Sequence, residues 1–363
     1  GVSAQPTSTT DVPLPTALQT SQPTATGTSP SPAVDCPVVL FARDRDLWRT
    51  NLDGDRVEHL TEGAPLTWQA GTGDGWVNYL STPVQVSPDG RWLTFLGQNA
   101  RVLVDVATRT QREMPLSSAV SPVGDWSPDS RYFAYGTDEG LYLYDVQTGH
   151  TDQWVDAALL GQEAGLNISN VVWSPTGDFI GFACCFTYPS AEALSATGQA
   201  QRLEIATGQL EEKGEIQGYV ATHNALCWTA AGQLVASEEL SMDERAEARC
   251  AKEGRAAYPL LPLVSPDGMN RVLLSPAASD DAFWIEPSLL TVSEVATEAR
   301  LWQRRLSETM KIVTWSPDGE YLLLDDDQAN SPIWRVKADG STELELLIEE
   351  GFLIGVVAQW CKR

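Results

Sequence analysis

Residues 315–324 read Trp-Ser-Pro-Asp-Gly-Glu-Tyr-Leu-Leu-Leu: an apolar strand end, a tight turn and the start of a second apolar strand. Each turn residue has a reason, because Pro317 fixes its φ at about −65°, Asp318 can cap its own backbone, and Gly319 can take a positive φ where the chain reverses. The same signal recurs at 86–90, 126–130, 173–177 and 264–268, in decayed form at 228–232, and begins again at 360–361.

The spacing of these turns gives the size of a repeat. Measured at the residue after the Trp or Val, successive copies lie 40, 47, 55, 36, 51 and 45 residues apart. Short strands and turns repeated at this spacing indicate a β-propeller with one blade per repeat. Seven such repeats nearly exhaust the 363 residues. The sequence therefore predicts an all-β fold, a seven-bladed β-propeller over residues 36–363.

The two ends of this domain complement each other. Residues 37–63 supply three strands that match those following the turn in later repeats, so the first strand of this blade is missing. Residues 355–360 form an apolar first strand with no blade of their own. Pairing the two ends removes an exposed sheet edge, so we expect a propeller closed by its C-terminal strand.

Residues 1–35 differ from the rest, because Ser, Thr and Pro make up 19 of the 35 residues. Such a segment cannot bury enough apolar surface to fold alone and favours extended conformations. We expect an extended Ser/Thr/Pro-rich tail, which is a tether, an O-glycosylated stalk or an assembly arm. Its candidate glycosylation sites are Thr7, Thr9, Thr10, Thr16, Thr20, Thr24, Thr26 and Thr28, and its candidate docking residues are Val12, Leu14 and Leu18. The sequon at Asn167 is a further candidate glycosylation site.

The charge excludes some partners. The formal net charge is −25 and no basic cluster interrupts the acidic surface. Such a surface repels nucleic acid and anionic lipid. No apolar run reaches the roughly 18 residues that a membrane helix needs. We therefore expect no nucleic-acid partner and no membrane span.

The turn repeats resemble the TolB-type, WD-like propeller repeats of bacterial envelope proteins, over about 37–363. Five of the seven turns match well, one matches weakly and the last is truncated. The family includes periplasmic interaction proteins, propeller domains of serine peptidases and secreted proteins of unknown role. The resemblance thus implies a fold rather than one activity. This sequence departs from TolB in lacking its separate α/β domain, and from the peptidases in lacking their hydrolase domain.

Motifs for catalysis are scarce. The three histidines, His59, His150 and His223, do not have metal-ligand spacing. There is no Gly-x-Ser-x-Gly elbow to support a nucleophilic serine. The acidic run 325–327 lacks the Gly and terminal Glu of an EF-hand, so we expect a solvated loop there. These observations predict a protein that is not an enzyme and that needs no cofactor.

Most of the 13 tryptophans occupy equivalent repeat positions and are expected to pack between blades. Trp68, Trp76 and Trp154 lie off the repeat pattern. They are the candidates for an exposed surface that binds a protein or a glycan.

Two disulfides are expected among the six cysteines. Cys36 and Cys361 fall at the two ends of one turn in the repeat alignment, close enough for a bridge. Cys227 lies in the first strand of blade five, and Cys250 is expected on a short helix that starts with a capping box at 241–244. Disulfides indicate an oxidising compartment.

Cys184 and Cys185 are adjacent in an expected strand. Because neighbouring strand residues face opposite sides, the pattern predicts one buried and one exposed thiol. A vicinal bridge is the alternative, and the sequence leaves the pairing open.

These features predict a non-enzymatic scaffold or interaction protein located outside the cell, on the cell surface or in the periplasm. Two readings remain open. In the first, the tail of one copy docks on the next propeller and the protein is a homopolymer subunit. In the second, a monomeric tethered propeller binds a protein or glycan on one ring face. A hydrolase with a site at the central channel is less favoured.

Overall fold

The computed structural model describes the ranges 38–44, 46–62, 84–96, 100–114, 120–160, 168–187, 195–219, 226–236, 239–240, 248–250, 263–276, 288–306, 310, 312–325, 331–357 and 360. Almost all regular structure in these ranges is antiparallel β-sheet, with one 3-10 turn, η1 (Ala157–Leu160). The prediction of an all-β fold is confirmed.

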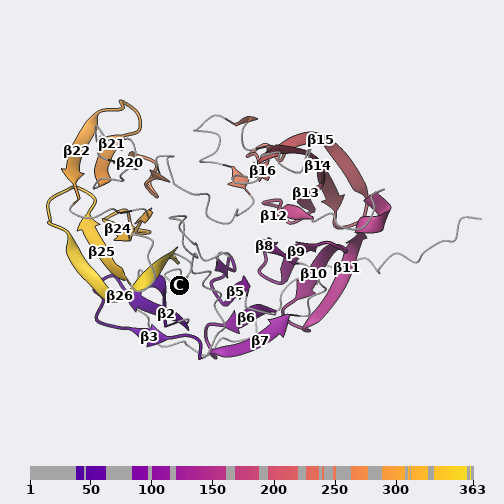
Figure 1. Ribbon diagram of the computed structural model, residues 1–363, viewed down its shortest axis with the longest axis horizontal. Coiled ribbons are helices and arrows are strands. Elements are labelled where there is room, and N and C mark those ends of the chain that lie inside the picture. The colour runs from indigo at the N-terminus through magenta and orange to yellow at the C-terminus, as the bar shows by residue number, and fades with distance from the viewer. Residues whose placement is uncertain are drawn as a thin grey trace, which may run out of the picture.

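Four sheets have four strands each, in chain order, so each is a simple meander. They consist of β4 (Gln85–Val86), β5 (Trp92–Leu96), β6 (Arg101–Asp105) and β7 (Thr110–Met114); β8 (Val120–Trp126), β9 (Tyr132–Thr137), β10 (Gly140–Asp145) and β11 (His150–Asp156); β12 (Ser169–Trp173), β13 (Phe179–Thr187), β14 (Ser195–Glu204) and β15 (Leu210–Tyr219); and β19 (Leu263–Val264), β20 (Asn270–Pro276), β21 (Ser288–Glu294) and β22 (Arg300–Arg305). Figure 1 shows the sheets arranged around a common centre, with later strands of each sheet farther out. This radial order is that of a propeller.

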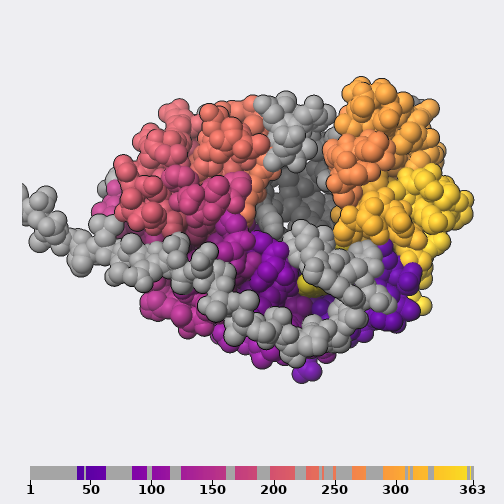
Figure 2. All heavy atoms as spheres, turned by 180° about the vertical axis from the view of Figure 1, so that it is seen from behind, coloured from indigo at the N-terminus to yellow at the C-terminus, as the bar shows by residue number. Residues whose placement is uncertain are grey.

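One seven-stranded sheet joins the two ends of the domain, in the order β23-β24-β25-β26-β1-β2-β3. Its strands are β23 (Ile312–Trp315), β24 (Tyr321–Asp325), β25 (Ser331–Lys337), β26 (Glu345–Val356), β1 (Val38–Arg43), β2 (Asp46–Asn51) and β3 (Glu58–His59). The first part of β26 pairs with β25, and its last residues pair with β1, with Phe352 opposite Ala42 and Val356 opposite Val39. Figure 2 shows the indigo N-terminal strands against yellow C-terminal residues.

The predicted pairing of the two ends therefore exists, but at a different place. The residues that pair with β1 are 352–356, whereas the sequence predicts a closing strand at 355–360. Trp360 lies beyond the end of β26, packs partly buried among core residues, and donates its indole N–H to the carbonyl of Gly90. The reason is that β26 is one long strand. Its residues 345–351 pair with β25, and the strand continues without a break into the pairing with β1, which therefore begins at Phe352.

The sheet near residue 230 has a different order, β17-β16-β18. It contains β16 (Leu226–Trp228), β17 (Leu234–Ala236) and β18 (Arg249–Cys250), and β18 pairs with the edge of β16 that β17 leaves free. Cys250 is thus in a strand, and its predicted place on a helix is wrong. Its backbone is positioned by the ladder with Cys227. The capping box at 241–244 lies outside the described residues.

The repeated turns fold as their chemistry predicts. In four copies the buried Ser hydroxyl donates to the Asp two residues on, at 2.5–2.6 Å, and accepts the backbone N–H five residues on, at 2.8–2.9 Å. Gly90, Gly268 and Gly319 have φ values of 73–75°, which is why glycine recurs there. Each turn therefore satisfies its own polar groups.

Tryptophan side chains connect neighbouring sheets through hydrogen bonds. The indole N–H of Trp126 donates to the Gln85 carbonyl at 3.4 Å, and that of Trp228 to the Val172 carbonyl at 3.1 Å. Both acceptors lie on the first strand of the preceding sheet. The core thus consists of layers between adjacent sheets, and each layer joins apolar residues from two of them.

Candidate functional site

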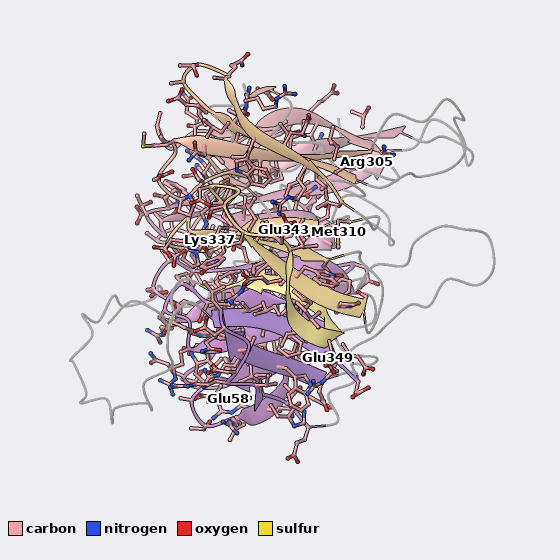
Figure 3. All side chains as sticks on the ribbon, turned by 90° about the vertical axis from the view of Figure 1, so that its left-hand side faces the viewer. Glu58, Arg305, Met310, Lys337, Glu343 and Glu349 are labelled. Carbon is pink, nitrogen blue, oxygen red and sulfur yellow. A yellow bond between two sulfur atoms is a disulfide. The ribbon has the colours of Figure 1, made fainter. Side chains whose placement is uncertain are left out.

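The two rims of the ring are built differently. One rim, here the tight-turn rim, carries the Ser-Pro-Asp-Gly turns and the short turns between the third and fourth strands of each sheet. At the opposite rim, here the loop rim, second strands end and third strands begin, and the chain leaves one sheet and enters the next. In Figure 3, Lys337 lies toward the tight-turn rim and Arg305 toward the loop rim.

At the tight-turn rim, aspartate side chains hydrogen-bond to backbone N–H groups of their own turns and pair with nearby arginines. Asp105 accepts the N–H groups of residues 107 and 108 through Oδ1 and pairs with Arg91 through Oδ2 at 3.1 Å. Asp145 does the same with residues 147 and 148 and with Arg131 at 3.0 Å. These carboxylates are engaged in holding turns, which leaves this rim few groups to offer a ligand.

The longer connections start and end at the loop rim. β3 ends at His59 and β4 begins at Gln85; β13 ends at Thr187 and β14 begins at Ser195; β20 ends at Pro276 and β21 begins at Ser288. Binding residues concentrate on loops that a rigid scaffold positions. The loop rim is therefore the better candidate for an interaction surface.

A second candidate lies where three sheets meet near the centre of the ring, at β8, β12 and β16 (Figure 1). Asp125 is the key residue: its Oδ2 accepts the backbone N–H of Trp173 at 2.8 Å and the Arg249 guanidinium at 2.9 Å. Arg249 also donates to the Trp126 carbonyl at 2.6 Å. One carboxylate oxygen thus connects β8, β12 and β18.

The predicted disulfide between Cys227 and Cys250 holds this arrangement. It closes a separation of 23 residues and fixes β18 beside β16, which places Arg249 toward Asp125. We call Asp125, Trp173, Arg249, Cys227 and Cys250 the inner clamp. The Asp125 side chain is 7% exposed and that of Arg249 is 27% exposed, so a nearly buried carboxylate is neutralised by a partly shielded guanidinium. This is the chemistry of a structural link.

The acidic run 325–327 is not the solvated loop that the sequence predicts, at least at its first residue. Asp325 is fully buried. Its Oδ1 accepts the Ser331 hydroxyl at 3.0 Å and its Oδ2 accepts the Leu353 N–H at 2.5 Å. Asp325 therefore ties β24 to the part of β26 that pairs with β1. Residues 326 and 327 lie outside the described ranges.

The described histidines have local partners. His59 stacks on Trp48 with a centroid separation of 4.1 Å and contacts Asp46 at 3.0 Å, and the exposed His150 contacts Asp152 at 3.1 Å. Within the described ranges no group of three or more His, Cys, Asp or Glu could hold a metal ion. No helix among them is long and apolar enough to cross a membrane.

The candidate surface residues have different outcomes. Trp154 lies on β11, partly buried against the core between the β8–β11 and β12–β15 sheets. The remaining predictions fall outside the described residues and stay predictions. They concern Cys36, Cys361, Asn167, Trp68, Trp76, Val12, Leu14, Leu18 and the eight tail threonines.

The structure corrects the prediction for the adjacent cysteines. Cys184 and Cys185 are both buried, at 1% and 4% exposure, instead of one buried and one exposed. The strand has a register shift at this point, which breaks the alternation of sides that the prediction assumed. No sequence signal marks this bulge.

Comparison with known proteins supports the fold. No protein-family model matches the chain, and no curated protein matches it. Among solved structures, dipeptidyl peptidase 4 of Porphyromonas gingivalis is similar with a TM-score of 0.52 and 13% identity over 85% of this chain and 57% of that one. TolB of Acinetobacter baumannii matches at 0.38, with 13% identity over 88% and 66% of the two chains. Oligogalacturonate lyase of Vibrio parahaemolyticus matches at 0.46, with 12% identity over 86% and 84%. The chain thus spans 57% of the length of the peptidase and 66% of that of TolB.

Proposed function

We propose that the chain is a non-enzymatic β-propeller that recognises a partner, another copy of itself included, at its loop rim. The carrying observation is the difference between the rims: the tight-turn rim uses its carboxylates and hydroxyls to hold its own turns, whereas the long connections start and end at the loop rim. A rigid scaffold with long connections at one rim suits binding.

The propeller is proposed to have seven blades. The seven-stranded sheet divides naturally into two blades, with β26 as the outer strand of one and the inner strand of the next. Together with the five other sheets this gives seven. Deleting residues 351–363 removes the strand that pairs with β1 and should expose an edge, so the variant should aggregate. A monomeric, cooperatively folding deletion variant would refute the closure.

The preferred occupant of the loop rim is the N-terminal tail of a neighbouring copy. An extended tail cannot bond to itself, so its backbone groups face water or pair with another surface. A head-to-tail contact of this kind does not close and yields a fibre. The alternative is a monomer that presents the same rim to a protein or a glycan.

Light scattering on the full chain tests the two readings over a range of concentrations. Deletion of residues 1–34 should abolish assembly, and so should replacing Val12, Leu14 and Leu18 with Ser, which keeps the tail's length. If the full chain remains monomeric at high concentration, or if the deletion variant still assembles, the tail is only a tether. The monomeric binding reading would then replace the polymer.

Export from the cytosol is part of the proposal. The Cys227–Cys250 bridge supports it, because disulfides of this kind persist in oxidising compartments. The hydrolase alternative is weaker, since the sequence has no nucleophile elbow and the charges of the inner clamp are already paired. Hydrolysis of peptide or glycoside substrates by purified protein, lost on changing one ring residue, would reinstate it.

A further inference from the structure

The side chains of β13 stop alternating between the two faces of the sheet at Cys185. Ile180, Phe182 and Cys184 alternate along the strand and pack into the core between the β8–β11 and β12–β15 sheets, while Ala183 packs into the core on the opposite face. In a regular strand Cys185 would share the face of Ala183. Instead it packs with Cys184. Both thiols therefore lie on one side of the sheet.

A bulge accounts for this. Cys184 is opposite Gln199 and Thr187 is opposite Thr197, so β13 takes three steps where β14 takes two. Cys185 has a φ of 64°, in the left-handed region that non-glycine residues seldom occupy. An extra residue in this conformation turns the side chain to its neighbour's face. Such a conformation persists only where other interactions hold it.

The two sulfurs are in close contact. Both are free thiols in the structure, and the Cys185 thiol donates to Cys184 Sγ with a sulfur–sulfur distance of 2.6 Å. Non-bonded carbon atoms, by comparison, rest at about 3.5–4.0 Å. The Cα atoms of neighbouring residues are only about 3.8 Å apart, so a bond between adjacent cysteines needs a backbone that brings both Cβ atoms to one side. The bulge supplies that backbone.

We propose that Cys184 and Cys185 form a vicinal disulfide while the chain folds in an oxidising compartment, and that this bond fixes the bulge of β13. The proposal needs an oxidising step but does not depend on partner binding at the loop rim.

The bond forms by thiol–disulfide exchange with a disulfide oxidant, either a protein oxidant or oxidised glutathione. One cysteine thiolate attacks the oxidant's disulfide, which forms a mixed disulfide and releases one thiol. The other cysteine attacks the mixed disulfide at the first cysteine's sulfur, which forms the Sγ–Sγ bond and releases the second thiol. The pair loses two electrons and two protons, and the oxidant gains both.

Exchange has to precede burial. In the folded chain the surrounding apolar core raises the pKa of the Cys184 thiol well above its ordinary value, because burial disfavours the thiolate. Only the thiolate attacks a disulfide. Once folded, the pair should therefore be out of reach of both oxidants and reductants.

Mass spectrometry tests the bond. The full chain is reduced, unfolded, refolded in a glutathione redox mixture, then denatured in an alkylating reagent and digested. The peptide containing both cysteines should carry no label, weigh two hydrogens less than the dithiol, and accept two labels only after reduction. The Cys227–Cys250 bridge is the internal standard, and the mixture is made more oxidising until that bridge is complete.

Two labels on the unreduced peptide, with the standard bridged, would overturn the proposal. A link from either cysteine to Cys36 or Cys361 would overturn it as well. In the variant Cys185→Ala, Cys184 should take one label without reduction, which shows that the reagent reaches this site in the denatured chain.

The effect on the bulge is tested separately. A variant with Cys36, Cys227, Cys250 and Cys361 replaced by Ala keeps only the adjacent pair. Hydrogen exchange of amides 183–187 and 197–199 should be at least tenfold faster in the chain refolded with this pair reduced than in the chain refolded with the pair oxidised, while exchange in β9 and β10 stays constant. Equal exchange in the two states would show that the bulge does not need the bond. If this variant does not fold, the wild-type chain and Cys185→Ala, each refolded until the Cys227–Cys250 bridge is complete, are compared at the same amides.

Discussion

The inner clamp provides the sharpest test of how the sheets are held together. Asp125→Ala removes the acceptor of two bonds, from the Trp173 N–H and from Arg249. A hydrogen bond to a charged group contributes about 1.5–3 kcal/mol, and breaking one partner of a buried ion pair costs about 3–5 kcal/mol. Since the Arg249 side chain is 27% exposed and water can reach it, we expect the lower end, a loss of about 3–4 kcal/mol in the free energy of unfolding.

Arg249→Ala should cost less, about 2 kcal/mol, because Asp125 keeps the N–H of Trp173. In the double variant the Arg249 change should add little, because its partner is already gone. The expected coupling energy is therefore about 1–3 kcal/mol. Urea denaturation of the four proteins at neutral pH measures it, provided that the slope of the transition is the same in all of them.

The matched control is the surface pair Arg271–Glu298, in which the arginine is similarly shielded, at 23% exposure, but the glutamate is 75% exposed. Its coupling should be at most about 1 kcal/mol and should fall in high salt, whereas the coupling in the inner clamp should persist. A clamp coupling below about 0.5 kcal/mol, or one equal to the control's, would refute the view that Asp125 connects the three sheets.

Three further predictions concern single residues. Ser127→Ala removes a buried hydroxyl that donates to Asp129 and accepts the Tyr132 N–H, and should lower the free energy of unfolding by about 2 kcal/mol. The control Ser341→Ala, at an exposed position, should lower it by less than about 0.5 kcal/mol, and equal losses would contradict the role of the Ser127 hydroxyl. Cys227→Ala should lower the free energy of unfolding by about 3 kcal/mol, because the bridge closes 23 residues, and should also weaken the coupling between Asp125 and Arg249. An unchanged Asp125–Arg249 coupling energy in the Cys227→Ala background would show that the bridge does not position Arg249. Burial raises the pKa of Tyr135 to about 12, so between pH 10 and 12 the folded chain holds a proton that the unfolded chain loses, and the contribution of Tyr135 to stability falls as the pH rises through this window. Burial raises the pKa of Tyr132 to about 12 too, so tyrosinate absorbance should show a late step from both residues, which Tyr135→Phe reduces by one tyrosine; an unchanged titration would contradict this.

The sequence alone determined the fold, because the chemistry that shapes its turns is local. Ser316, Pro317, Asp318 and Gly319 form a turn whose hydrogen bonds close within a few residues, so reading one turn predicts the others. The pairing of Cys227 with Cys250 could also be predicted from the sequence, since the two positions fall in one repeat.

Only the tertiary structure decided features that depend on contacts between distant residues. Arg249 reaches Asp125 across 124 positions of sequence, and the buried Asp325 accepts the N–H of Leu353, in the part of β26 that pairs with β1 from the other end of the domain. The bulge that turns Cys185 toward Cys184 depends on the register of β14, and the end of β26 depends on its pairing with β1. None of these has a local signature, because each is set by which strands meet around the ring.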